Sequence, residues 1–149
     1  MTASMSTAEV VAFLEREFPQ LQENGSTFRV EHAEHGLARM RLVFHTRHLR
    51  PGGTISGPAM FALADVSLYV AVLASVGPVA LAVTTNLSIN FLRKPAPGDL
   101  LGEARLLKLG RRLAVGEVSL REAEGARGLV AHATGTYSIP DRQDEEPGT

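Results

Sequence analysis

Hydrophobic and polar positions recur with two different periods along the chain, and the period separates expected helices from expected strands. Near the start, four apolar residues share one face at helical spacing: Val10, Phe13, Leu14 and Phe18. Ser6 and Glu9 lie just before this run and have the spacing of a capping box. In this motif each side chain accepts a hydrogen bond from the other residue's backbone. The pattern predicts a short amphipathic helix over about residues 6–18.

The most apolar helical stretch of the chain begins at Pro58 and ends near Ser75. Pro58 suits the first helical turn, where its missing N–H costs nothing, and Gly77 with Pro78 would stop the helix. The uncharged run over residues 66–83 has the length of a membrane span, but Gly77 interrupts it. We therefore interpret the run as a buried helix followed by a buried strand.

Six segments have the alternation or composition of strands, and they cover residues 28–34, 37–45, 79–92, 99–109, 113–122 and 128–139. The order is therefore one helix, two strands, the long apolar helix and four strands. This order predicts an α+β fold in which a single, strongly curved antiparallel sheet wraps around the apolar helix. We expect one domain over residues 1–140, followed by a disordered acidic tail over 141–149. Such a sheet leaves exposed edge strands, so we expect association with a second copy.

Composition narrows the classes of function. With 149 residues, 44% of them hydrophobic and 21% charged, the chain fits one globular domain. A net charge of −1 gives no reason to expect binding to nucleic acid or to an anionic membrane surface. The absence of cysteine excludes disulfides, thiolate metal sites and a cysteine nucleophile.

His45 and His48 could share a metal, but no third ligand is evident, so we expect none and interpret both as surface or cleft residues. The N-terminus lacks signal-peptide features, and a cytoplasmic location is the expectation.

Asp65 is the only charged residue between Arg50 and Arg93, and it lies in the middle of the apolar helix. Burying an unpaired carboxylate costs several kcal/mol, so Asp65 either has core hydrogen-bond partners or takes part in chemistry. Gly57, eight residues earlier, lies at the helix start, where free backbone N–H groups could hold a carbonyl oxygen as it gains charge. The helical rise separates the two residues by about 12 Å. Asp65 therefore cannot reach a carbonyl at its own Gly57, but two such helices packed antiparallel across a twofold axis would bring it beside the partner's Gly57.

Other polar residues have both a functional and an ordinary interpretation. Thr84, Thr85 and Asn86 form a polar triplet in an otherwise apolar predicted strand. One of them could orient a water beside Asp65, although threonine is also a common strand residue. Four cationic side chains could contact phosphate groups or could simply be solvated turn residues: Arg93, Lys94, Arg111 and Arg112.

Four motifs together resemble a known family. They are residues 50–65 (Arg-Pro-Gly-Gly-Thr-Ile-Ser-Gly-Pro-Ala-Met-Phe-Ala-Leu-Ala-Asp), 87–99 (Leu-Ser-Ile-Asn-Phe-Leu-Arg-Lys-Pro-Ala-Pro-Gly-Asp), 110–113 (Gly-Arg-Arg-Leu) and 135–137 (Gly-Thr-Tyr). The chain resembles the hotdog-fold acyl-CoA thioesterases over residues 28–137, in particular the branch related to the phenylacetate-degradation thioesterase PaaI. The eight-residue spacing of Gly57 and Asp65 on an apolar helix is the most specific part of the match.

The resemblance implies an enzyme that hydrolyses an acyl-CoA or aryl-CoA thioester. It implies that Gly57 polarises the thioester carbonyl, that Asp65 activates water or attacks directly, and that Thr84 helps to orient the water. It further implies that coenzyme A is part of the substrate, that no separate cofactor is needed, and that the active site is shared across a homodimer, with a homotetramer as the expected assembly. The expected substrate-binding residues are Arg50, Ser56, Arg93, Lys94, Arg111 and Arg112.

The chain also departs from the family pattern. Relatives commonly have His-Gly-Gly at the helix start, where this chain has Ser56, Gly57 and Pro58, and they often have an asparagine where it has Arg50. The N–H of Gly57 survives these changes, because a following proline removes only its own N–H. The departures favour one alternative, a non-catalytic protein that binds or senses acyl-CoA. A hydratase or dehydratase is a third possibility, and it would need His45 or His48 close to Asp65.

Overall fold

The structure of the chain is a computed structural model that describes residues 4–22, 27–125 and 127–140. The expected tail over 141–149 lies outside the described residues. In chain order the helices and strands are α1 (Thr7–Glu17), β1 (Phe28–Glu34), β2 (Leu37–Leu42), α2 (Gly57–Val76), β3 (Val83–Phe91), β4 (Leu100–Leu109), β5 (Leu113–Glu122) and β6 (Leu129–Ser138). Two short 3-10 turns, η1 (Pro19–Gln22) and η2 (Thr46–His48), lie between them.

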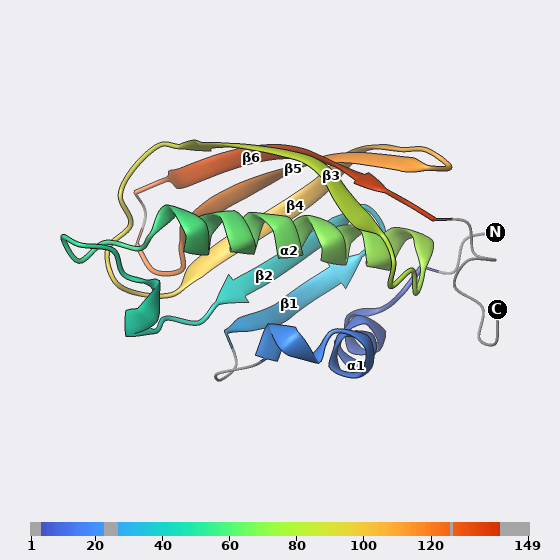
Figure 1. Cartoon of the computed structure of the whole chain (residues 1–149), viewed down its shortest axis with the longest axis horizontal. Coiled ribbons are helices and arrows are strands. Elements are labelled where there is room, and N and C mark those ends of the chain that lie inside the picture. The colour runs from blue at the N-terminus through green and yellow to red at the C-terminus, as the bar shows by residue number, and fades with distance from the viewer. Residues whose placement is uncertain (1–3, 23–26, 126, 141–149) are drawn as a thin grey trace.

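The strands form one antiparallel sheet in the order β1-β2-β4-β5-β6-β3. The sheet curves around α2, which crosses its concave face, while α1 lies beside β1 (Figure 1). This is the hotdog architecture that the sequence predicts. The capping box at the start of α1 is also confirmed, since the Ser6 side chain accepts from the Glu9 N–H and the Glu9 carboxylate accepts from the Ser6 N–H.

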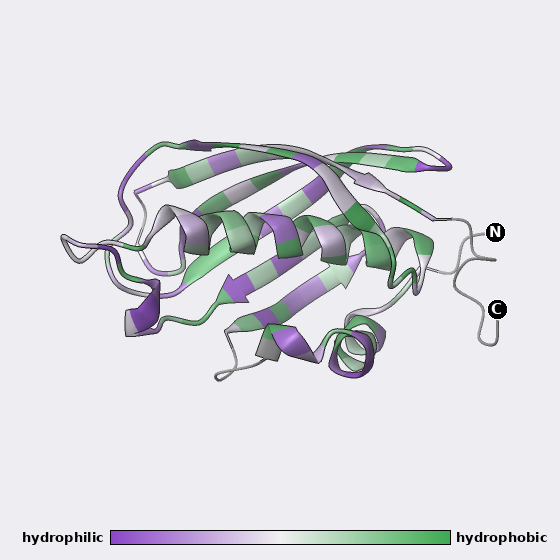
Figure 2. Ribbon diagram, viewed as in Figure 1, coloured by the Kyte–Doolittle hydropathy of each residue, from purple (hydrophilic) through white to green (hydrophobic). Residues whose placement is uncertain are grey.

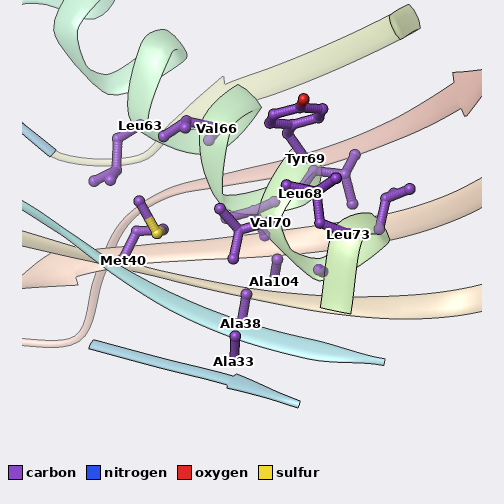
Figure 3. Packing of buried hydrophobic residues seen from close by; sticks show 14 of the residues in the cluster. Ala33, Ala38, Met40, Leu63, Val66, Leu68, Tyr69, Val70, Leu73 and Ala104 are labelled. Carbon is purple, nitrogen blue, oxygen red and sulfur yellow. The ribbon is translucent and has the colours of Figure 1, made fainter. Parts of the chain in front are cut away.

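Helix α2 is the centre of the hydrophobic core. Leu63, Leu68 and Val70 project towards the sheet, where Met40 and Ala104 are among the residues they meet (Figure 3). Figure 2 shows hydrophobic positions recurring along the whole helix and on the strands behind it. This helix is long and apolar enough to cross a membrane, but most of it is buried inside the protein, so the core accounts for its hydrophobicity.

Glycines in three neighbouring strands let α2 approach the sheet closely. A Cβ added at Gly102 would lie 2.6 Å from Ser67 Oγ, and one at Gly116 would lie 2.6 Å from Leu68 Cδ1. A Cβ at Gly135, on the next strand, would lie 2.9 Å from Leu68 Cδ2. Side chains at these positions would push the helix away from the sheet. The close packing fixes where the polar residues of α2 lie relative to the strands.

The two edges of the sheet differ in how they are covered. At β1, the Thr7 hydroxyl on α1 accepts from the Ala33 N–H at 3.0 Å and lies 3.3 Å from the Ala33 carbonyl oxygen. At the other edge, β3 pairs with β6 alone among the described strands, and Val83 and Phe91 are 55% and 51% exposed. The expectation of a buried strand after α2 is therefore wrong within a single chain. Local apolar composition cannot reveal that a strand comes last in the order of the sheet.

Candidate active site

The start of α2 is built by a loop that is fixed at several points. Leu49 and Ile55 form an isolated β-bridge, the Ser56 N–H donates to the His48 carbonyl at 2.8 Å, and the Ile55 N–H donates to the Pro95 carbonyl at 3.2 Å. Ser56 is extended, as an N-cap residue should be, and its hydroxyl accepts from the Ala59 N–H at 3.2 Å. These contacts set the direction in which the helix begins.

Within the described residues, the first turn of α2 has one free backbone donor. Ala59 is capped by the Ser56 hydroxyl, Met60 donates to the Ser56 carbonyl at 3.2 Å, and Pro58 has no N–H. The N–H of Gly57 has no hydrogen-bond partner in that part of the chain. It therefore lies free at the positive end of the helix dipole, where it can donate to an oxygen that carries negative charge.

A pocket of about 490 Å³ adjoins this helix start. Its polar lining includes three of the predicted substrate-binding residues, Arg50, Arg93 and Lys94, and its apolar lining includes Phe91 and Leu92. Gly57 lies against the Phe91 ring, since a Cβ added there would be 3.4 Å from Phe91 Cζ. The structure thus brings Gly57 together with three cations from two separate segments.

The Asp65 carboxylate lies against two hydroxyl groups. Its Oδ1 accepts from Thr84 Oγ1 at 2.6 Å and from the Tyr137 hydroxyl at 2.7 Å. The Tyr137 hydroxyl also lies 3.1 Å from the Asp65 carbonyl oxygen. Thr84 and Tyr137 face each other in the register of β3 and β6, and a bulge follows Thr84. Three elements therefore meet at this carboxylate: α2, β3 and β6.

Tyr137 is the one residue of this cluster that sequence reasoning missed as a site residue. It stands in the motif over residues 135–137, but no local signal shows that its ring points towards α2. Burial, and then the negative charge of Asp65, raise the pKa of the Tyr137 hydroxyl far above its usual value. The hydroxyl is therefore a neutral hydrogen-bond donor at any pH near neutrality.

A second pocket, of about 470 Å³, opens beside Asp65. Apart from Asp65, Thr84 and the two tyrosine hydroxyls, its walls are apolar and include Phe18, Leu21 and Phe28 from the N-terminal part of the chain. The Tyr69 ring stacks on Tyr137 with centroids 5.9 Å apart and meets Phe18 edge-on at 6.0 Å. An apolar group can occupy this space with its polar end at the carboxylate.

Gly57 and Asp65 line different pockets of the chain, in keeping with the separation of about 12 Å expected from eight helical rises. The two pockets lie at opposite ends of the same edge strand. Val83 and Thr84, at the start of β3, belong to the Asp65 pocket, whereas Phe91, at its end, belongs to the Gly57 pocket.

Several predicted residues lie elsewhere. Arg111 and Arg112 are in the turn between β4 and β5 and line neither pocket.

His45 and His48 do not line the Asp65 pocket. His48 is 7% exposed, so it is buried instead of being a surface residue, and its Nδ1 has no partner among the described residues. The described segments contain no cluster of three residues able to hold a metal ion.

Comparison with known proteins gives a consistent result. The family model described as "Thioesterase superfamily" matches residues 52–129. A protein of Pseudomonas aeruginosa that is provisionally classed as an esterase is 33% identical over 137 residues, which are 91% of this chain and 99% of the relative.

Two solved structures extend the likeness to the fold. The crystal structure of a protein from Silicibacter sp. TM1040, provisionally classed as a thioesterase, has 55% sequence identity and a TM-score of 0.80, covering 91% of this chain and 92% of the other. The phenylacetic acid degradation protein PaaI from Thermus thermophilus, solved as a mutant, has 28% identity and a TM-score of 0.70, covering 82% of this chain and 99% of the other.

Proposed function

The chain belongs to the thioesterase superfamily, and we propose from this that it hydrolyses an acyl-CoA or aryl-CoA thioester to the free acid and coenzyme A. The observation that carries the proposal is the division of the polar groups between the two ends of β3. One end has a carboxylate beside an apolar pocket, and the other has a free backbone donor beside three cations. Hydrolysis of a CoA thioester needs both a group that activates the attacking water and a donor that stabilises negative charge on the carbonyl oxygen, and each end of β3 has one of the two.

A second copy of the chain would join the two halves. Strand β3 is an exposed, uncharged edge, which is the kind of surface that pairs with another strand. If two β3 strands pair antiparallel across a twofold axis, the Thr84 end of one meets the Phe91 end of the other. The Asp65 pocket of one subunit then opens onto the Gly57 pocket of its partner. The homodimer is the smallest active unit in this proposal, and assembly into a tetramer stays a prediction.

In the proposed reaction the thioester carbonyl oxygen accepts from the Gly57 N–H of one subunit. Asp65 of the other subunit removes a proton from water as the water oxygen attacks the carbonyl carbon. The tetrahedral intermediate then collapses, the carbon–sulfur bond breaks, and the thiolate of coenzyme A leaves and takes up the proton that Asp65 removed from water, which restores the carboxylate. Attack by the Asp65 carboxylate itself, through an anhydride that water then hydrolyses, gives the same products. Thr84, next to the carboxylate, helps to place the water.

The two pockets also divide the substrate between them. The acyl group enters the apolar pocket beside Asp65, among Phe18, Tyr69 and Val66. The phosphates of coenzyme A lie near Arg50 and Lys94 at the Gly57 pocket, where cations and a helix N-terminus favour anions.

Arg111 and Arg112 could reach coenzyme A only from the second subunit. The Ile139 N–H donates to the Arg112 carbonyl at 2.7 Å, and Leu113 and Val83 both pair with Ser138. The β4–β5 turn therefore lies at the end of the sheet where β3 begins. In the antiparallel dimer this end approaches the partner's Gly57 pocket, so a phosphate contact for these arginines is part of the proposal.

A non-catalytic acyl-CoA binding protein is the second candidate. The observation that favours it is that Asp65 already has hydrogen-bond partners, as a purely structural aspartate would. It predicts calorimetric binding of acyl-CoA without release of thiol. The hydratase alternative has less support, because neither His45 nor His48 lines the Asp65 pocket.

The test is a thiol-release assay of the purified protein over short, long and aromatic acyl-CoAs. The wild type should hydrolyse at least one of them, and Asp65→Asn should lose about 10²–10⁴-fold in kcat because it removes the base but keeps the shape. Glu117→Gln, which removes a carboxylate outside both pockets, is the matched control and should keep wild-type activity. Binding without turnover would favour the second candidate, and an Asp65→Asn variant as fast as wild type would reject the proposed role of Asp65.

A further inference from the structure

We propose that Tyr137 is a positioning residue, which with Thr84 holds Oδ1 of Asp65 and leaves Oδ2 as the oxygen that reacts. The inference rests on the proposed function and adds a residue and a division of labour within the carboxylate. Tyr137 acts through Asp65 and needs no contact with the substrate.

The first observation is the asymmetry of the carboxylate. Both hydroxyl groups donate to the same oxygen, Thr84 at 2.6 Å and Tyr137 at 2.7 Å. Oδ2 accepts no hydrogen bond from any described residue, and it is not among the enclosed polar atoms that lack a partner. One oxygen is therefore occupied by two donors, while the other is open and free to accept a proton or to attack carbon.

The second observation is how firmly Tyr137 is held. Tyr137 is only 3% exposed, and its ring stacks on the Tyr69 ring with centroids 5.9 Å apart. In the register of β5 and β6 it pairs with the small residue Ala114. A buried aromatic ring has only two side-chain torsions, so little freedom remains to be lost when it orients another group. The raised pKa of its hydroxyl keeps the donor proton in place.

The chemical consequence follows from how a carboxylate rotates. Without hydrogen-bond donors on one of its oxygens, an aspartate carboxylate can rotate about χ2 and present either oxygen to the substrate, because this terminal torsion is broad. Two donors on Oδ1 fix the plane of the group and direct Oδ2 to one place. A misplacement of about 1 Å at a reacting atom can cost about 10²-fold in rate, so holding the plane has a measurable effect.

Three variants test this, assayed in the full dimeric protein with the best acyl-CoA of the panel. Tyr137→Phe keeps the stacked ring and removes the hydroxyl, and it should lower kcat about 10–100-fold with KM changed less than about threefold. The decisive measurement is the double variant Asp65→Asn/Tyr137→Phe, in which the residual rate should equal that of Asp65→Asn alone, because the hydroxyl then has no base to orient. Ser119→Ala is the control, since it removes a hydroxyl on β5 that lines neither pocket and lies away from the β3 edge, and it should keep wild-type kcat.

Thr84 supplies a second route to the same oxygen if Tyr137→Phe does not fold. Thr84 is exposed on an edge strand, so Thr84→Val should fold, and it should lower kcat, whereas Thr84→Ser, which keeps the hydroxyl, should recover most of it.

The outcomes separate this inference from the proposed function. Two results would overturn the positioning role while leaving the thioesterase proposal standing. One is a wild-type kcat in Tyr137→Phe, and the other is that Tyr137→Phe lowers kcat by the same factor in the wild-type protein and in Asp65→Asn. No hydrolysis of any acyl-CoA by the wild type would overturn both.

Discussion

The pockets at the two ends of β3 have nearly the same volume, about 470 and 490 Å³, but are built in opposite ways. The Gly57 pocket depends on the backbone: a capped helix start supplies one free N–H, and cations surround it. The Asp65 pocket depends on side chains from distant parts of the chain: a carboxylate on α2, hydroxyls on β3 and β6, and aromatic walls from the N-terminal segment.

Because they are built so differently, the two halves should fail in different ways. The backbone donor of the Gly57 half is set within a few residues of sequence, so a single backbone change should remove that donor without disturbing the fold. The Asp65 half depends on the packing of three elements, so its variants report on tertiary contacts as well as on chemistry. If the active site is shared, the two halves act together only when two chains associate.

After Asp65→Asn, removing the backbone donor should have the largest effect. Gly57→Pro deletes the free N–H at a helical position where proline is favoured, and Ser56 is already extended as a residue before proline must be. We expect kcat to fall about 10²–10³-fold, as for the loss of an oxyanion donor. Gly57→Ala keeps the N–H and adds a methyl group at ordinary contact distance from Phe91, so it should stay within about tenfold of wild type. Equal activity of the two variants would show that the N–H is not used.

Mixing the two defective halves tests whether they come from different chains. Gly57→Pro and Asp65→Asn chains, each nearly inactive alone, should regain activity after co-refolding or co-expression. Random association gives about half heterodimers, each with one intact site of two, so recovery should approach about a quarter of the wild-type rate. No recovery in a preparation where mass spectrometry shows heterodimers would reject the shared active site.

Neutralising cations at the Gly57 pocket should have a smaller effect, mainly on binding. Arg50→Gln and Lys94→Gln should each raise KM for the CoA substrate several-fold with little change in kcat, because they contact a part of the substrate away from the reacting atoms. The increase should shrink at high salt, where wild-type binding is itself weakened. Arg29→Gln, on the opposite edge strand, is the control for net charge, and an equal KM effect there would reject local phosphate binding.

The smallest predicted effect is on stability at alkaline pH. The Tyr137 hydroxyl has its pKa raised in the folded protein, while in the unfolded chain it is about 10. Its contribution is therefore complete below about pH 10 and is lost as pH rises above that, by about 1.4 kcal/mol per pH unit. Urea unfolding over about pH 9–11 should show the stability difference between wild type and Tyr137→Phe narrowing as pH rises. A constant difference would contradict the raised pKa.

Much of the Gly57 half follows from local sequence. Ser56, Gly57 and Pro58 set the helix start, because capping and the missing proline N–H act over three residues. The long apolar stretch predicts a buried helix, and the number of residues between Gly57 and Asp65 gives their separation through the helical rise. These features depend on nearest neighbours and on periodicity, which a single sequence displays.

The residue pattern alone is enough to place a carboxylate in the middle of an apolar helix and a glycine at its start, too far apart to act together in one chain. The tertiary structure was needed to show that Tyr137, 72 residues beyond Asp65, donates to its carboxylate, and that the strand after α2 is an exposed edge. It likewise placed Arg50, Arg93 and Lys94 around Gly57 and left Arg111 and Arg112 outside both pockets. These contacts could not be predicted because sheet order and register arise from long-range pairing, which alternation along one segment does not encode.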